Sequence, residues 1–73
     1  MDIENVDQPI VVARANLSKL HAAVQLLRRI YFLNSRGSRE AALVPTELGE
    51  AALAVGGADV AIDLLKKAAQ EKR

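Results

Sequence analysis

Residues 10–34 read IVVARANLSKLHAAVQLLRRIYFLN, and the apolar side chains of this stretch repeat with a period of seven. With Leu17 at position a of a heptad, positions a and d are apolar along the whole stretch except at the last d position. These positions are Ile10, Leu17, Val24 and Tyr31 at a, and Ala13, Leu20, Leu27 and Asn34 at d. The pattern predicts an amphipathic helix with a seam suited to coiled-coil packing.

The predicted first helix covers residues 8–35. Asp7 and Pro9 are suited to a helix start, because Asp caps free amide groups and Pro is tolerated in the first turn. The segment 34–38, Asn-Ser-Arg-Gly-Ser, is typical of a turn and ends the helix. Two alternatives remain open at this stage: a short strand over 10–12, and a break in the helix near Asn16.

The length of this helix suggests self-association. At about 1.5 Å per residue it would be about 42 Å long, whereas a compact chain of this size is about 29 Å across. Residues 26–33 are apolar on nearly every side of the helix, so this end needs cover on all sides. We therefore expect a helical homodimer, with a seam formed by Ile10, Ala13, Leu17, Leu20, Val24, Leu27 and Tyr31.

The rest of the chain also predicts helices. The segment 39–55 is rich in Ala and Leu but is interrupted at Pro45, and Gly56-Gly57 separates it from a helix over 58–71. Residues 1–7 are acidic and are expected to be flexible. The predicted fold class is thus all-α: a single helical domain over 8–73, with a long amphipathic first helix and a C-terminal helical hairpin.

Composition argues against several kinds of function. The 73 residues contain no Cys and one His, which leaves no conventional zinc site. No nucleophile has a base partner in any recognisable motif, so we expect no enzyme, no catalytic residue, no metal and no cofactor. The net charge of +1 gives little attraction to nucleic acid or to a membrane surface, and no apolar run is long enough to span a bilayer. We expect a cytoplasmic protein.

The segment 48–65 resembles the helix-turn-helix of small repressors at a few positions: Ala52, Gly56, Ile62 and Leu65. That resemblance implies DNA binding by its second helix. The same segment is similar to one helix pair of a tetratricopeptide repeat, which implies a packed hairpin. The start of the second helix, however, carries Asp59 and Asp63 rather than basic residues, and acids meet phosphates unfavourably.

These observations favour a small regulatory or adaptor protein that binds another protein, in an inhibitory, chaperone-like or scaffolding role. A DNA-binding transcriptional regulator is the alternative. Aromatic and arginine side chains are common anchors of protein interfaces, and such residues cluster around the end of the first helix. The predicted partner-binding residues are Arg28, Arg29, Phe32, Arg36 and Arg39.

Overall fold

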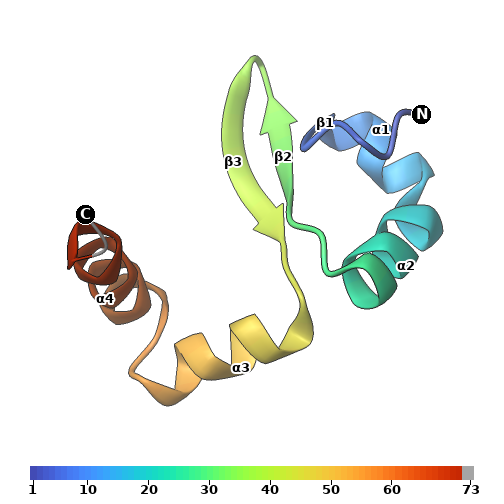
Figure 1. Ribbon diagram of the computed structural model, residues 1–73. Helices are drawn as coiled ribbons and strands as arrows, with labels where there is room; N and C mark the ends of the chain where they lie inside the picture. Colours follow the sequence, from blue (N-terminus) through green and yellow to red (C-terminus); the bar gives the residue numbers. More distant parts are fainter. Residues whose placement is uncertain (72–73) are drawn as a thin grey trace.

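The computed structural model describes residues 1–71 and has a mixed α/β fold (Figure 1). The prediction of an all-α helical bundle with a coiled-coil seam is wrong, because a three-stranded sheet forms in the middle of the chain. The last two residues of the predicted domain, 72–73, lie outside the described part. The elements in chain order are β1 (Asp7–Pro9), α1 (Ile10–Ala15), α2 (Leu17–Leu27), β2 (Tyr31–Ser35), β3 (Ser38–Leu43), α3 (Thr46–Ala54) and α4 (Ala58–Glu71).

The predicted long helix is broken at Asn16. This residue has φ −121° and ψ 27°, outside the helical range, and it separates α1 from α2. Its side-chain Nδ2 donates a hydrogen bond to the carbonyl oxygen of Val12 at 2.9 Å. Short amide side chains compete in this way with the helical backbone pattern. A helix of 42 Å therefore does not exist.

A second break follows α2. Arg28 adopts the left-handed conformation (φ 60°, ψ 36°) and ends the helix. Tyr31, Phe32 and Leu33 then begin β2, where successive side chains point to opposite faces of the sheet. Tyr31 is buried and Leu33 packs against the core, whereas Phe32 lies on the other face. The apolar residues of the segment 26–33 therefore do not surround a single helix. Some belong to the end of α2 and others to the start of β2.

The sheet has the order β1-β2-β3. β1 pairs with β2 in parallel, and β2 pairs with β3 antiparallel. A two-residue turn at Arg36-Gly37 joins β2 to β3, and both residues have positive φ (53° and 79°). Two positive φ angles are the requirement of the tight hairpin turn that matches strand twist, and glycine adopts one without strain.

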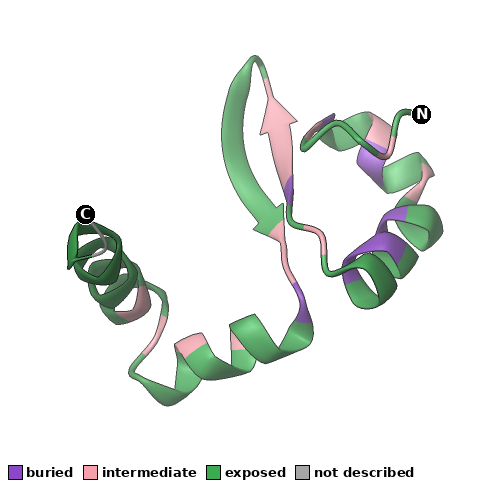
Figure 2. Cartoon of the chain, in the orientation of Figure 1, coloured by how far each residue is buried: buried purple, intermediate pink, exposed green. Residues whose placement is uncertain are grey.

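The hydrophobic core lies between the sheet and the helices α1 and α2. Figure 2 places the buried positions there, with one more at the turn before α3. The buried apolar side chains are Ala13, Leu20, Ala23, Val24 and Tyr31, and Leu33 and Leu43 pack against them. We refer to residues 1–45 as the body.

The helices α3 and α4 extend away from the body, and we call residues 46–71 the arm (Figure 1). The second predicted helix was placed over 39–55, but its first part is β3, and the helix starts only after the buried Pro45. α4 occupies the range in which the sequence predicts a helix. Neither α3 nor α4 has a buried residue. The arm accounts for a radius of gyration of 13.6 Å, compared with about 11 Å for a compact chain of this length.

The position of the core predicts that two leucines of α2 contribute very differently to the free energy of unfolding. Leu20 is 0% exposed and Leu26 is 73% exposed. We expect Leu20→Ala to lower the free energy of unfolding by about 2–5 kcal/mol, because it removes buried methyl groups and leaves a cavity. Leu26→Ala should change it by less than about 0.5 kcal/mol. Urea denaturation followed by circular dichroism measures both, and equal effects would contradict this placement of the core.

Candidate functional site

A large concave surface is an apolar groove where the arm meets the sheet. Its volume is about 850 Å³. One side is formed by β3, the floor by α3 and the opposite side by α4, which faces β3 across the groove (Figure 1). Its lining residues are mainly aliphatic, and most of them are alanines and leucines: they include Ala41, Ala42, Val44, Leu48, Ala52, Val55, Ala61, Ile62 and Leu65.

The arm exposes several large apolar side chains. Leu53 is 77% exposed, Leu65 is 59% exposed and Ile62 is 48% exposed. On α4, Ala58, Ile62 and Leu65 follow helical spacing and form an apolar stripe along one face. Contiguous apolar patches on soluble proteins commonly mark interaction sites. The groove and this stripe together form the candidate site.

The arm is held to the body by few polar contacts. The guanidinium of Arg28 donates from Nη1 to both carboxylate oxygens of Glu47, at 3.1 and 3.2 Å. Both side chains are more than half exposed, so the pair contributes little to stability. The pKa of Glu47 is held below its usual value by a hydrogen bond from its own backbone N–H and, secondly, by Arg28. The contact orients the first turn of α3.

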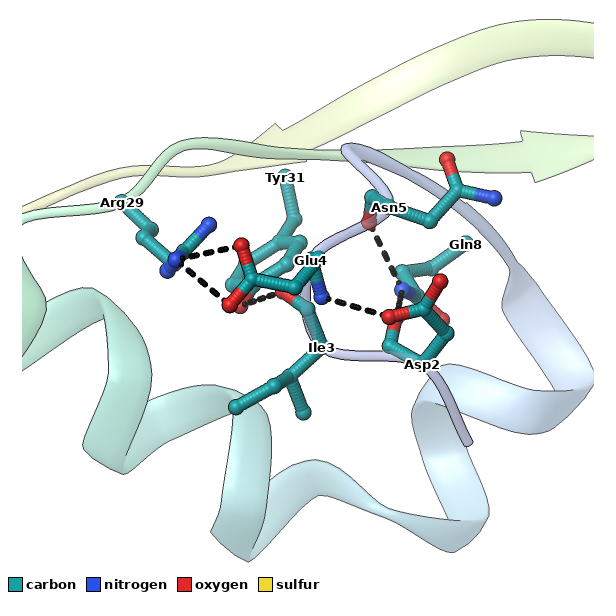
Figure 3. A network of polar contacts seen from close by, with 7 residues as sticks. All are labelled: Asp2, Ile3, Glu4, Asn5, Gln8, Arg29 and Tyr31. Atoms are coloured by element: carbon teal, nitrogen blue, oxygen red, sulfur yellow. Dashed lines mark hydrogen bonds and ion pairs between the residues drawn. The ribbon is translucent and has the colours of Figure 1, made fainter.

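A second arginine fastens the N-terminal loop to the body (Figure 3). Arg29 donates from Nη2 to both oxygens of Glu4 at 2.9 Å. Beside it, the hydroxyl of the buried Tyr31 donates to the carbonyl oxygen of Ile3 at 2.7 Å. The buried Gln8 donates to two carbonyl oxygens of the same loop. Arg29 therefore serves an internal contact in this structure.

Two of the predicted partner-binding residues do come together, on the outer face of the sheet. The guanidinium of Arg39 lies 3.8 Å from the centre of the Phe32 ring, a cation–π arrangement. Arg39 also donates to both oxygens of Asp7, from Nε at 2.7 Å and from Nη2 at 3.0 Å. This pair links β1 to β3 across β2. Arg36 lies apart from them, at the tip of the hairpin.

The five predicted partner-binding residues do not form one cluster. Arg28 and Arg29 precede β2, whereas Arg36 and Arg39 lie at the hairpin end of the sheet. Only Phe32 and Arg39 line the groove. No sequence pattern indicates the groove itself, because the groove depends on Val44-Pro45 turning the chain from β3 into α3.

The predicted dimer seam is divided between the core and the surface. Ala13, Leu20, Val24 and Tyr31 are buried inside the chain. The remaining seam residues are exposed: Ile10, Leu17 and Leu27. A seam running along a single helix is excluded by the fold, and the homodimer stays a prediction.

The described residues carry no arrangement typical of a metal site. Within residues 1–71, no group of three or more His, Cys, Asp or Glu side chains lies close enough to hold a metal ion. In the same part of the chain, no helix combines the length and the apolar character needed to cross a membrane. Comparison with protein-family models, with curated proteins and with solved structures finds no match for this chain.

The Arg39 contact generates a prediction for pH dependence. The hydrogen bonds from Arg39, and a weaker one from Asn34, hold the pKa of Asp7 below its ordinary value of 3.8. A lowered pKa in the folded state stabilises the fold above the ordinary pKa, and this stabilisation is lost as pH falls through the lowered value. We expect Arg39→Gln to raise the pKa of Asp7 in an NMR titration. Arg14→Gln, at an exposed position on α1, should leave that pKa unchanged; an unchanged value in Arg39→Gln would contradict the contact.

Proposed function

We propose that this chain is a small non-enzymatic regulatory or adaptor protein that acts by binding another protein through its arm. The observation that supports this proposal most directly is that α3 and α4 have no buried residue yet expose a series of large apolar side chains. A body that folds around its own core does not need such an extension for its stability. The arm is therefore suited to contacts outside the chain.

The physical chemistry of α4 supports the same proposal. An isolated helix of 14 residues is marginally stable in water, because helix nucleation is unfavourable and most helical stability comes from packing of an apolar face. The apolar stripe of α4 would gain that packing in a hydrophobic groove of a partner, as amphipathic helices do in helix-in-groove recognition. Binding would then stabilise the helix and the complex together.

The partner is expected to present an apolar surface rather than a strongly charged one. The exposed charges of α4 are mixed, and Lys67 pairs with Asp63 at 3.2 Å. The apolar stripe would supply most of the affinity, and Arg39, which lines the same groove, would contribute to orientation. We further propose that the protein acts in the cytoplasm and forms a homodimer.

The alternative of DNA binding by the 48–65 hairpin gains little support from the same geometry. The first turns of α4 present Asp59, Val60 and Asp63, which lack the positive charge that phosphates require. Steeply salt-dependent retention of the purified protein on DNA would nevertheless favour that alternative over a protein partner.

The test of the proposed function is capture by photo-crosslinking from α4 in the native host, followed by reconstitution with the purified partner. We expect Leu65→Glu to weaken the reconstituted complex by about 100-fold, because it places a charge in a desolvated apolar contact. Lys66→Glu, on the adjacent exposed position, is the matched control and should change affinity by less than about fivefold. Equal affinity of the wild type and Leu65→Glu would contradict a role for the arm.

A further inference from the structure

The free edge of β3 lies along the groove. β3 is the outer strand of the sheet and pairs with β2 on one side; no other strand of residues 1–71 pairs with its second side. Arg39, Glu40, Ala41 and Ala42 are consecutive, and all four line the groove. The pairing of β2 with β3 skips Glu40, because Leu33 pairs with Ala41 and Asn34 with Arg39, so β3 has a bulge at this residue. From Ala41 to Leu43 the strand is regular, and there the groove runs beside an edge whose backbone N–H and C=O groups are available for pairing.

The two edges of the sheet differ in how they are protected. β1 has three residues and ends at Pro9, which has no N–H to donate. β3 has six residues, no Pro, and the small side chains Ala41 and Ala42, both exposed, in its second half. Natural proteins protect edge strands by shortness, Pro, charged side chains, bulges or covering elements, because an open edge is a template for pairing. In β3 the charges and the bulge lie at Arg39 and Glu40, so the segment Ala41 to Leu43 has none of the sequence-based protections.

We propose that the β3 edge pairs antiparallel with β3 of a second copy of this chain, so that two three-stranded sheets join into one continuous sheet across a two-fold axis. A single strand from a foreign protein would leave its own outer edge open. A second copy covers both open edges at once, and the joined sheet then ends on each side at β1 with Pro9. The small net charge of +1 gives little repulsion between copies.

The sequence of β3 restricts the register of this pairing. With the two-fold axis perpendicular to the sheet, equivalent side chains of the two copies lie on the same face, so a residue can stand opposite its own equivalent. A register that places Glu40 opposite Glu40 of the second copy brings like charges together and is unfavourable. A register with Ala41 opposite its own equivalent brings no like charges directly opposite each other. It places the two-fold axis at the start of the regular segment Ala41 to Leu43, next to the bulge at Glu40.

This interface lies on the opposite wall of the same groove from the arm's proposed contact with a foreign partner. The second copy occupies the sheet side of the groove, at Ala41 and Ala42, whereas the partner contacts the apolar stripe of α4. Failure of one proposal therefore does not imply failure of the other. Leu65→Glu addresses the arm, and substitutions at Ala41 address the sheet edge.

The test uses charge substitutions at the two-fold axis. Ala41 is exposed, so Ala41→Glu and Ala41→Lys should both fold, which circular dichroism checks. Each variant alone should self-associate about fivefold more weakly than the wild type, because like charges stand directly opposite each other. An equimolar mixture should favour the Glu/Lys heterodimer beyond the statistical proportion in native mass spectrometry.

Ala22→Glu, on the exposed surface of α2, is the matched control and should dimerise like the wild type. Sedimentation of the wild type from micromolar to millimolar concentration should show a dimer. A wild type that stays monomeric over this range would overturn the proposal. So would Ala41→Glu and Ala41→Lys variants that dimerise at wild-type strength and mix in statistical proportion.

Discussion

The burial of Tyr31 is the interaction on which the body depends. Its ring is 1% exposed and belongs to the same core as Leu20, which is 0% exposed. Its hydroxyl donates to the carbonyl oxygen of Ile3, so one side chain connects the central strand, the helix α2 and the N-terminal loop. A buried hydroxyl requires such a partner. Because Tyr31 is the first residue of β2, its burial also determines where this strand begins and which face of the strand points toward α2.

The heptad pattern identified much of the core but not the fold. Leu20, Val24 and Tyr31 are buried, as a seam would require, but they pack within one chain. A period of 3.5 along a helix and a period of two along a strand both point Tyr31 toward the same core, so the pattern could not separate the two structures. The decisive features were local. Asn16 bonds to the backbone of Val12, and Arg28 adopts a left-handed conformation that no sequence rule assigns to Arg.

Other parts of the chain were predictable because a residue type with a fixed backbone preference marked them. Pro45 ends the strand segment and precedes α3, and Gly56, with φ 123°, separates α3 from α4. The turn at Arg36-Gly37 was expected, but it joins two strands rather than two helices. The candidate site was not predictable, because the groove arises only from the direction in which the arm leaves the body. The sequence pattern singled out Phe32 and Arg39, which line this groove. It placed them near the end of a long helix, however, whereas they lie on β2 and β3.

The chain thus consists of a body with its own small core and an arm whose apolar side chains have no cover in that body. Amide hydrogen exchange of the purified protein without a partner tests this division most directly, since exchange protection follows local packing. The amides of Leu20 to Val24 in α2 should be well protected, whereas those of α4 should exchange rapidly. Equal protection of α2 and α4 would contradict the account, because it would mean that the arm gains its stability from the body.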